Sequence, residues 1–214
     1  MPAGDLAAAP IVGAAGPGDG WGSAADALRA GQVVVVPTDT VYGVGVAAWD
    51  AGAIERLFRL KGRDRTKPVA VLVADLAQAE RIGRFDPIAR RLAERFWPGA
   101  LTMVLGRQAD FTSRLGGDRT SVGLRCPHHP ALAELLTEVG PLAVTSANRS
   151  GQPTPSTAAE AAAQLDGEVS VVVDGGTLAG VASTVVDCTG PFPEVLREGP
   201  VSREQIRTAI ADLL

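Results

Sequence analysis

Apolar positions follow two different periods along this chain, and the change between them divides it into strands and helices. Residues 33–36 and 69–73 are continuous, largely β-branched apolar runs, which is typical of strands buried on both faces of a sheet. Residues 54–60 instead repeat apolar side chains at helical spacing. Strands that alternate with helices in this way predict an α/β fold built on an open sheet.

The same patterns, together with capping residues and Gly/Pro breaks, predict the other elements. Strands are expected at 33–36, 41–46, 69–73, 101–105, 121–125, 141–144, 169–173, 182–187 and 194–197. Helices are expected at 23–30, 50–60, 130–139 and 157–165, in short segments that begin near 75 and 86, and from 202 onward. We find no internal repeat and no later linker, so residues 23–214 are predicted to form one domain. Residues 1–22 are rich in Ala, Gly and Pro and are expected to form a flexible tail.

Composition and charge narrow the classes of function. The formal charge of −4 and the isoelectric point near 5.2 argue against a broad nucleic-acid surface, which needs a basic stripe. Any anion site must therefore be local. No run approaches the roughly 20 apolar residues of a membrane helix, and the N-terminus lacks the basic start of a secretory signal. We expect a cytoplasmic protein that does not contact a membrane.

The two cysteines, Cys126 and Cys188, lie far apart and have no CxxC partner. This spacing argues against a disulfide framework and against a zinc site. We expect buried or unreactive thiols in a reducing compartment.

Residues 61–68 form a short stretch with four cations in seven residues, in an otherwise acidic protein. Gly62 and Pro68 indicate a turn between a predicted helix and a predicted strand. The charges alone allow two interpretations, a solvated basic loop or a group of cations that converge on one polyanion. The cations are Lys61, Arg63, Arg65 and Lys67.

Polar groups gather where three predicted strands end. Residues 38–40 (Thr-Asp-Thr) follow one strand, Arg125 ends another, and residues 145–151 supply hydroxyls, an amide and a glycine after a third. Ligands of open α/β sheets bind at such strand ends, and an arginine there suits a carboxylate or a phosphate. The alternatives are an ordinary turn and a surface ion pair.

Three further features are weaker signals. Gly43 and Gly45 lack the third glycine and the strand-to-helix position of a dinucleotide fingerprint, and no Walker A sequence occurs. His128 and His129 have no third ligand nearby, so we expect capping or surface residues rather than metal ligands or bases. Trp97 is expected to cover the core rather than to stack on a ligand.

Six short motifs occur in order along the chain: PTDTVYG at 37–43, KGR at 61–63, FWPGALT at 96–102, SANRSG at 146–151, STVVD at 183–187 and LR at 196–197. In this order they resemble the YrdC-type L-threonylcarbamoyladenylate synthases, over about residues 23–202. One such motif is weak evidence, but six in order are specific, and they favour the polyanion interpretation of the basic stretch. The resemblance implies a twisted open mixed sheet flanked by helices, with a concave basic ligand-binding surface.

Members of that family form threonylcarbamoyladenylate and diphosphate from ATP, L-threonine and bicarbonate, for the N6-threonylcarbamoyl group on adenosine 37 of tRNAs that read ANN codons. The resemblance thus implies a nucleotidyltransferase whose product passes to a threonylcarbamoyl-transferase complex. It implies Mg²⁺ held mainly by ATP and water, and it allows a weak contact with tRNA. An amine and carbon dioxide form a carbamate without a protein nucleophile, so no catalytic Cys or His is required.

The resemblance also implies roles for individual residues. Lys61 and Arg63 would hold the triphosphate and serve catalysis. The full ATP site would comprise Lys61, Arg63, Lys67, Ser121, Ser146, Asn148, Thr154 and Arg197. L-Threonine would be bound by Thr40, Arg125 and Ser183, and no residue is expected to be a metal ligand.

Two residues depart from the pattern of the family. Lys67 stands where many relatives carry asparagine, and Leu72 stands where some carry a threonine-contacting histidine, which leaves the choice between threonine and serine open. The chain ends soon after Arg197, so we expect a minimal form in which another segment, such as the N-terminal tail, closes the site.

Two rival functions share this fold. One is a module that binds tRNA or double-stranded RNA without catalysis, against which the acidity and the 4% aromatic content argue. The other is a carbamoyl-adenylate-forming domain of the hydrogenase-maturation type, which normally accompanies zinc fingers and an acylphosphatase domain. No CxxC pair occurs in this chain.

Overall fold

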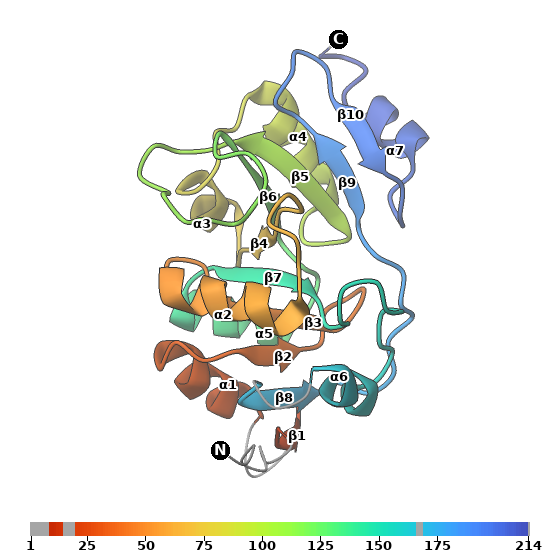
Figure 1. The fold of residues 1–214 in the computed structure, drawn as a ribbon. Helices are drawn as coiled ribbons and strands as arrows, with labels where there is room; N and C mark the ends of the chain where they lie inside the picture. The colour runs from red at the N-terminus through yellow and green to blue at the C-terminus, as the bar shows by residue number, and fades with distance from the viewer. Residues whose placement is uncertain (1–8, 15–19, 166–168, 214) are drawn as a thin grey trace.

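The computed structural model describes residues 9–14, 20–165 and 169–213. Within these residues, ten strands form one sheet in the order β1-β8-β2-β3-β7-β4-β6-β5-β9-β10. Figure 1 shows this twisted sheet running from β1 and β8 at one end of the molecule to β10 at the other. The strands are β1 (Ile11–Gly13), β2 (Val34–Val36), β3 (Gly43–Ala47), β4 (Ala70–Leu72), β5 (Leu101–Gly106), β6 (Ser121–Arg125), β7 (Leu142–Ser146), β8 (Val171–Asp174), β9 (Thr184–Asp187) and β10 (Glu194–Arg197).

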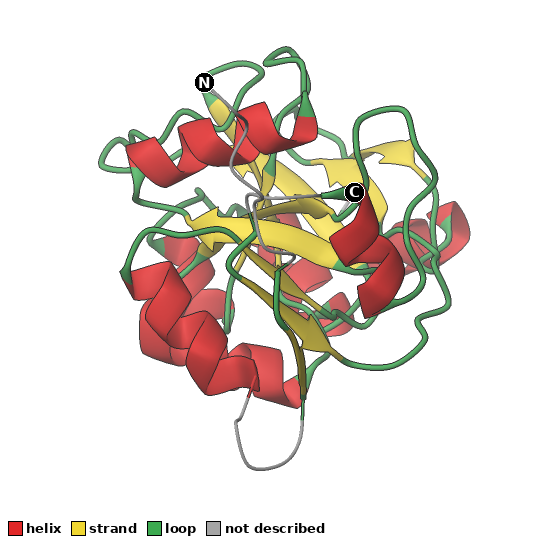
Figure 2. Cartoon of the chain, turned by 60° about the horizontal axis from the view of Figure 1, so that its bottom comes forward, coloured by secondary structure: helices red, strands yellow, loops and turns green. Residues whose placement is uncertain are grey.

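Helices lie on both sides of the sheet (Figure 2). They are α1 (Gly20–Arg29), α2 (Ala51–Lys61), α3 (Leu76–Glu80), α4 (Pro87–Phe96), α5 (Pro130–Val139), α6 (Ala158–Gln164) and α7 (Arg203–Ala209). In this part of the chain no helix has the length and hydrophobicity that crossing a membrane requires.

Strand directions make the sheet mixed, as the resemblance implied. Parallel pairs join β1 to β8, β2 to β8, β4 to β6 and β5 to β9. Antiparallel pairs join β2 to β3, β3 to β7, β4 to β7, β5 to β6 and β9 to β10. The single-domain open α/β fold predicted from the sequence is therefore confirmed.

Each face of the sheet is covered differently. One face packs against α2, α3, α4, α6 and α7, and this large cluster includes Val35, Val71, Met103 and Leu124. The opposite face packs against α1 and α5 only where β2, β4, β7 and β8 lie, in a smaller cluster that ends at Leu72 and Val144. Beyond this boundary the second face of the sheet borders a cavity. Successive strand residues point to opposite faces, so the same strands build both the large core and the cavity floor.

The ordered fold begins earlier than residue 23. Residues Ile11–Gly13 form β1, which pairs in parallel with β8, and α1 begins at Gly20. Trp21 is 8% exposed and packs in the smaller cluster, so burial of this ring outweighs the Ala/Gly-rich composition around it. The rest of the expected tail, residues 1–8 and 15–19, lies outside the described residues.

Strand β3 begins at Gly43, two residues later than expected, and its glycines have a packing role. A Cβ atom on Gly43 would lie 2.6 Å from Val144 Cγ1, and one on Gly45 would lie 2.7 Å from Val144 Cγ2. The Val144 side chain thus fills the space that both side chains would need. This close contact between β3 and β7 explains why glycine occupies both positions. The two glycines do not form a dinucleotide fingerprint.

Candidate functional site

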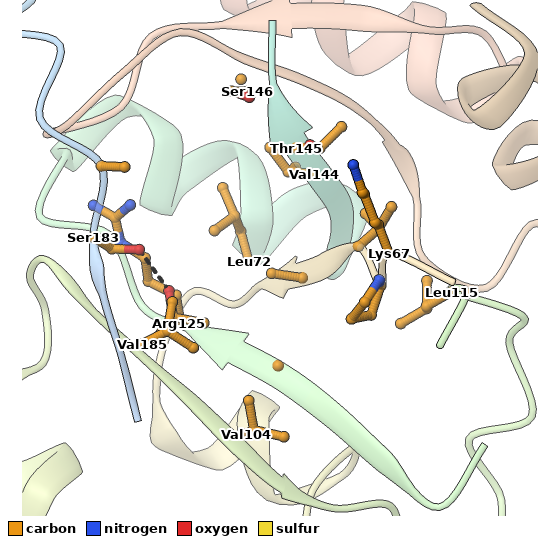
Figure 3. A pocket seen from close by; sticks show the side chains of 18 of the residues that line it. Lys67, Leu72, Val104, Leu115, Arg125, Val144, Thr145, Ser146, Ser183 and Val185 are labelled. Atoms are coloured by element: carbon orange, nitrogen blue, oxygen red, sulfur yellow. Dashed lines mark hydrogen bonds between the residues drawn. The ribbon is translucent and has the colours of Figure 1, made fainter. Parts of the chain in front are cut away.

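A cavity of about 580 Å³ opens on the part of the sheet that α1 and α5 leave bare. Most of its floor consists of alternate residues of the strands beneath it, and Val69, Val122 and Thr145 also line the cavity. Figure 3 shows side chains from several strands projecting into it, with Lys67 and Arg125 far apart. The floor comprises Ala70, Leu72, Thr102, Val104, Ser121, Gly123, Arg125, Val144, Ser146, Ser183 and Val185.

The site therefore differs from the arrangement expected from strand ends alone. Ser121 and Arg125 lie at opposite ends of β6, and a strand of this length spans about 13 Å. The cavity runs along the face of the sheet instead of lying beyond one edge. Nine of the eleven residues singled out from the sequence line it: Thr40, Arg63, Lys67, Ser121, Arg125, Ser146, Thr154, Ser183 and Arg197.

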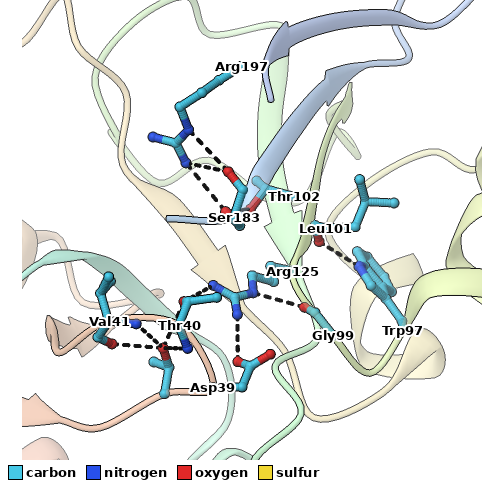
Figure 4. A network of polar contacts seen from close by, with 11 residues as sticks. Asp39, Thr40, Val41, Trp97, Gly99, Leu101, Thr102, Arg125, Ser183 and Arg197 are labelled. Atoms are coloured by element: carbon cyan, nitrogen blue, oxygen red, sulfur yellow. Dashed lines mark hydrogen bonds and ion pairs between the residues drawn. The ribbon is translucent and has the colours of Figure 1, made fainter. Parts of the chain in front are cut away.

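One end of the cavity is organised around Arg125, whose side chain is held by three neighbours (Figure 4). Its Nε donates to the Gly99 carbonyl at 3.0 Å, one terminal nitrogen donates to Thr40 Oγ1 at 2.7 Å, and the other contacts Asp39 Oδ1 at 2.5 Å. Arg125 is 6% exposed. Burial lowers the pKa of Arg125 and the Asp39 carboxylate opposes that shift, but a guanidinium stays charged in proteins.

The three contacts leave two of the five N–H groups of the Arg125 guanidinium for another acceptor. Thr40 is itself fixed, because its Oγ1 lies 3.0 Å from Thr38 Oγ1. The Thr38 hydroxyl also donates to the Val41 carbonyl at 2.7 Å, which stabilises the turn that carries Thr40. A fixed guanidinium with unused donors suits a planar carboxylate.

Ser183 and Arg197 form the neighbouring wall of the cavity (Figure 4). Ser183 Oγ lies 2.8 Å from Thr102 Oγ1, and Arg197 donates from Nη2 to the Ser183 carbonyl at 2.8 Å. Burial lowers the pKa of Arg197. Hydroxyls and a second cation thus lie close to the Arg125 end.

Lys61 and Asn148 are the two predicted residues that do not line the cavity, although both contact one that does. The Lys61 ammonium donates to the Ser146 carbonyl and lies 3.4 Å from Asn148 Oδ1. Ser146 Oγ donates to the same Asn148 oxygen at 2.5 Å. Lys61 is 3% exposed. Burial, and then the Arg63 charge, lower the pKa of Lys61 to about 7.

The other end of the cavity is the basic turn after α2. The turn begins where Gly62, with φ of 57°, ends the helix in the left-handed conformation. The side chains of Arg63 and Lys67 line the cavity. Arg63 bonds its own turn, donating to the carbonyls of Lys67 at 3.0 Å and Pro68 at 2.9 Å. Burial lowers the pKa of Arg63.

The fourth cation of the basic stretch, Arg65, does not line this cavity. It forms an ion pair with Glu55 and lies over the Phe58 ring at 4.6 Å. Both partners belong to α2, so Arg65 packs on the helix that precedes the turn.

Sequence reasoning placed Thr38 and Asp39 in a polar group at a strand end but gave neither an individual role, and it missed Thr102, although all three lie within a quoted motif. It also missed Arg107, which lines the cavity beyond the end of β5. Buried polar side chains are paired in folded proteins, so a polar residue inside an apolar strand, as Thr102 is, was an available signal.

The histidine, cysteine and tryptophan residues considered from the sequence have packing or capping roles. His129 accepts the Leu132 N–H at 3.3 Å as the N-cap of α5, which is the capping role expected. Cys126 and Cys188 are buried free thiols whose pKa values burial raises to about 11 and about 12. Trp97 packs against the core and donates to the Leu101 carbonyl at 2.7 Å.

Across the described ranges, no group of three or more His, Cys, Asp or Glu side chains could hold a metal ion. No His or Cys is among the described residues that line the cavity either. The arrangement favours binding of a carboxylate and of a polyphosphate in one space.

The chain matches the model of the Sua5/YciO/YrdC family, described as telomere recombination, over residues 26–199. It is 48% identical over 186 residues to a putative threonylcarbamoyl-AMP synthase of Mycobacterium tuberculosis, with 86% of each chain covered. It is 41% identical over 194 residues to the threonylcarbamoyl-AMP synthase of Bacillus subtilis, covering 89% of this chain and 56% of that protein.

Solved structures agree with the sequence matches. The crystal structure of Pyrococcus abyssi Sua5 complexed with L-threonine superposes with a TM-score of 0.87 at 36% identity, covering 94% of this chain and 61% of that one. Escherichia coli YciO superposes with a TM-score of 0.82 at 28% identity, covering 92% and 97%. The chain thus spans about three fifths of the archaeal protein and nearly all of YciO.

Proposed function

Because the chain belongs to the Sua5/YciO/YrdC family, we propose that it forms L-threonylcarbamoyladenylate and diphosphate from ATP, L-threonine and bicarbonate. The names of the relatives and the L-threonine bound to the Pyrococcus protein support this choice. The product serves the N6-threonylcarbamoyl modification of adenosine 37 in tRNAs that read ANN codons. In this proposal a cytoplasmic transferase complex receives the adenylate, and tRNA itself contacts the synthase only weakly.

One observation carries the proposal. A single cavity joins a buried guanidinium with unused donors at Arg125 to a cationic turn at Arg63 and Lys67. An amino-acid carboxylate fits the first end and a polyphosphate fits the second. The absence of thiols and imidazoles from the described cavity lining agrees with a reaction that needs no protein nucleophile.

At the Arg125 end, the residues bind and orient L-threonine. Arg125 donates to its carboxylate, and the hydroxyls of Thr40 and Ser183 contact its amine or side chain. Asp39 and Gly99 keep the guanidinium in place. The neutral amine, facing the rest of the cavity, attacks carbon dioxide formed from bicarbonate with loss of water. The new N–C bond gives the carbamate, and the amine releases one proton to solvent.

At the other end, the residues bind ATP and stabilise developing charge. The carbamate oxygen attacks the α-phosphorus, the bond from that phosphorus to the bridging oxygen breaks, and diphosphate leaves with the electron pair. Lys61 and Arg63 hold the triphosphate, where preorganised cations act on the transition state. Lys67, Ser121, Ser146, Asn148 and Thr154 belong to the same nucleotide site, and Arg197 completes it from the wall beside Arg125.

Mg²⁺ accompanies ATP in this proposal. Because the described residues offer no cluster of acidic ligands, the ion is held by phosphate oxygens and water, which suits the coordination preferences of Mg²⁺. Its contribution is to neutralise phosphate charge. The protein supplies position and the remaining positive charge.

The test is to incubate the protein with ATP, labelled bicarbonate and each amino acid in turn, and to detect the adenylate by mass and the released diphosphate. We expect a labelled product with L-threonine, little product with Arg125→Ala, and unchanged yield with Arg207→Gln on α7 as a control. Tight tRNA binding without diphosphate release would instead support the RNA-binding alternative. Product formation with serine at the same efficiency would remove the selectivity for threonine.

A further inference from the structure

A second cavity, of about 350 Å³, adjoins the basic end of the main one. The two share Arg107, Leu115 and Gly116 in their linings. Its volume lies at the lower end of the range for small-molecule sites. Four arginines line it, against two acids. The arginines are Arg65, Arg107, Arg114 and Arg119, and the acids are Glu55 and Asp118.

Two segments that are far apart in the sequence build this second cavity, and they are joined through their backbones. The Val69 N–H donates to the Leu115 carbonyl at 2.8 Å, and the Gly117 N–H donates to the Arg65 carbonyl at 2.7 Å. Gly116 has a φ of 79°, and a Cβ on it would lie 2.8 Å from the Arg65 carbonyl oxygen. The loop that carries Arg114 and Arg119 is thereby fixed against the basic turn.

The acids at this site are already engaged. Glu55 pairs with Arg65, and Asp118 accepts from the N–H and the hydroxyl of Thr120. The side chains of Arg114 and Arg119, in contrast, are exposed and have no hydrogen bond or ion pair with any described residue. Two exposed guanidinium groups are therefore left for an external anion.

Arg107 connects this cavity to the main one. Its terminal nitrogens donate to the carbonyls of Ser113 at 2.6 Å and Ser121 at 3.1 Å, while its buried Nε has no partner among the described residues. Burial lowers the pKa of Arg107, and the nearby Arg119 charge adds to that effect while Asp118 opposes it. The positive charges of Arg107 and Arg119 repel each other, and an anion that binds between them would offset this repulsion.

We propose that this arginine-lined cavity is a binding site for inorganic diphosphate, through which the leaving group passes from the main cavity to solvent. The proposal rests on the proposed synthase function, because that reaction releases diphosphate beside Arg63 and Lys67. A multiply charged anion leaves a cationic cavity more easily when another cationic group receives it. Glu55 and Asp118 lie among the arginines of this cavity, and the net charge of the chain is −4. Both features disfavour a long nucleic-acid backbone here and favour a small oxyanion.

The test measures diphosphate binding by titration calorimetry, with no ATP and no threonine present. The variant Arg114→Gln/Arg119→Gln removes two exposed charges and should weaken diphosphate binding about tenfold, because charge-assisted contacts to phosphate are lost. Arg114→Lys/Arg119→Lys should keep part of the affinity, and Arg207→Gln on α7 should bind as the unchanged protein does. Higher salt should weaken binding in the unchanged protein more than in the glutamine variant.

Equal diphosphate affinity in the glutamine variant and the unchanged protein would overturn the proposal. A larger loss of tRNA binding than of diphosphate binding would also overturn it, and would assign these arginines to a nucleic acid. Since the titration needs no turnover, a protein that makes no adenylate can still bind diphosphate here. Conversely, an active synthase whose glutamine variant shows unchanged product inhibition by diphosphate would keep its function and lose this site.

Discussion

The two ends of the main cavity differ in how their charged groups are held. Arg125 is 6% exposed and is bonded to Gly99, Thr40 and Asp39. Lys67 is exposed, lies on a turn, and its ammonium has no hydrogen-bond partner within the described ranges. The Arg125 guanidinium is fixed before a ligand arrives, whereas the other end supplies charge from the exposed Lys67 side chain.

This difference indicates a division of tasks. A guanidinium that is already oriented loses little conformational entropy on binding, so it can select a ligand by shape. An exposed ammonium on a flexible stem attracts any polyanion, and salt screens that attraction. We therefore expect selection of the amino acid at the Arg125 end and charge-dependent affinity for ATP at the Lys67 end.

The change that would alter this comparison most is Arg125→Ala. It removes the proposed contact to the amino-acid carboxylate and leaves the Asp39 carboxylate, whose side chain is 14% exposed, without its cation. We expect a loss of about 3–5 kcal/mol of stability, as for other broken buried pairs, and a larger rise in KM for threonine than for ATP. Urea unfolding and steady-state kinetics check both. A rise confined to the KM for ATP would reassign Arg125 to the nucleotide.

Lys61→Ala tests whether the buried Lys61 ammonium, like the Arg125 guanidinium, acts as a cation that is held in place before the ligand binds. Lys61 is 3% exposed and bonded to Ser146, so we expect a loss of about 2–4 kcal/mol of transition-state stabilisation, measured as kcat/KM. The control is Arg59→Ala, which removes an exposed cation from the same helix. Near-normal turnover of the Lys61 variant would exclude a role for its charge.

The pH dependence of the free energy of unfolding tests whether Lys61 is buried as a charged group. Burial, followed by the Arg63 charge, lowers the pKa of Lys61 from 10.5 to about 7 in the folded protein. Between these values the unfolded chain binds a proton that the folded protein does not, so the contribution of Lys61 to stability rises with pH above about 7. Below that pH both states are protonated and the cost of burying the charge is fully present.

The measurement is urea unfolding of the unchanged protein and of Lys61→Met at pH 6 and pH 9. Subtracting the two removes all other titrating groups. We expect the unchanged protein to gain stability relative to the variant as the pH rises. Parallel pH profiles would show that Lys61 keeps an ordinary pKa.

Lys67→Asn should have the smallest effect. Because this ammonium is exposed and unpaired, we expect at most about 1 kcal/mol in ATP affinity, and a weaker dependence of that affinity on salt. The KM for threonine should not change. A loss as large as that of Lys61→Ala would mean that both ends of the cavity are equally fixed.

Much of the fold was predictable because local patterns determine it. The strand Ser121–Arg125 and the helix Pro130–Val139 match their predicted bounds, and a proline and a glycine mark the two ends of the helix. Strand β1 was missed, because three residues in an Ala/Gly/Pro-rich segment carry no periodic signal. Strand order was also out of reach, since pairing depends on contacts distant in the sequence.

The sequence led to most of the cations of the site but not to the polar partners that hold them. Strand ends and the family resemblance led to Arg125, Ser183 and Arg197, which the structure brings to one cavity. They gave no role to Asp39, which contacts Arg125, or to Thr102, which contacts Ser183. Partners of this kind depend on the distance between strands. Arg65 shows the converse, because its charge counted toward the basic stretch while its side chain packs on α2.

The cavity floor has a consequence for how the protein tolerates change. Along β6, Ser121, Gly123 and Arg125 line the cavity and Leu124 packs in the core cluster, while Val122 belongs to that cluster and also borders the cavity. A saturation scan of this strand should therefore show two interleaved phenotypes, loss of abundance at one set of positions and altered substrate response at the other. With such an arrangement, single substitutions on the cavity side of the strand can change substrate preference between paralogues without a compensating change in the core.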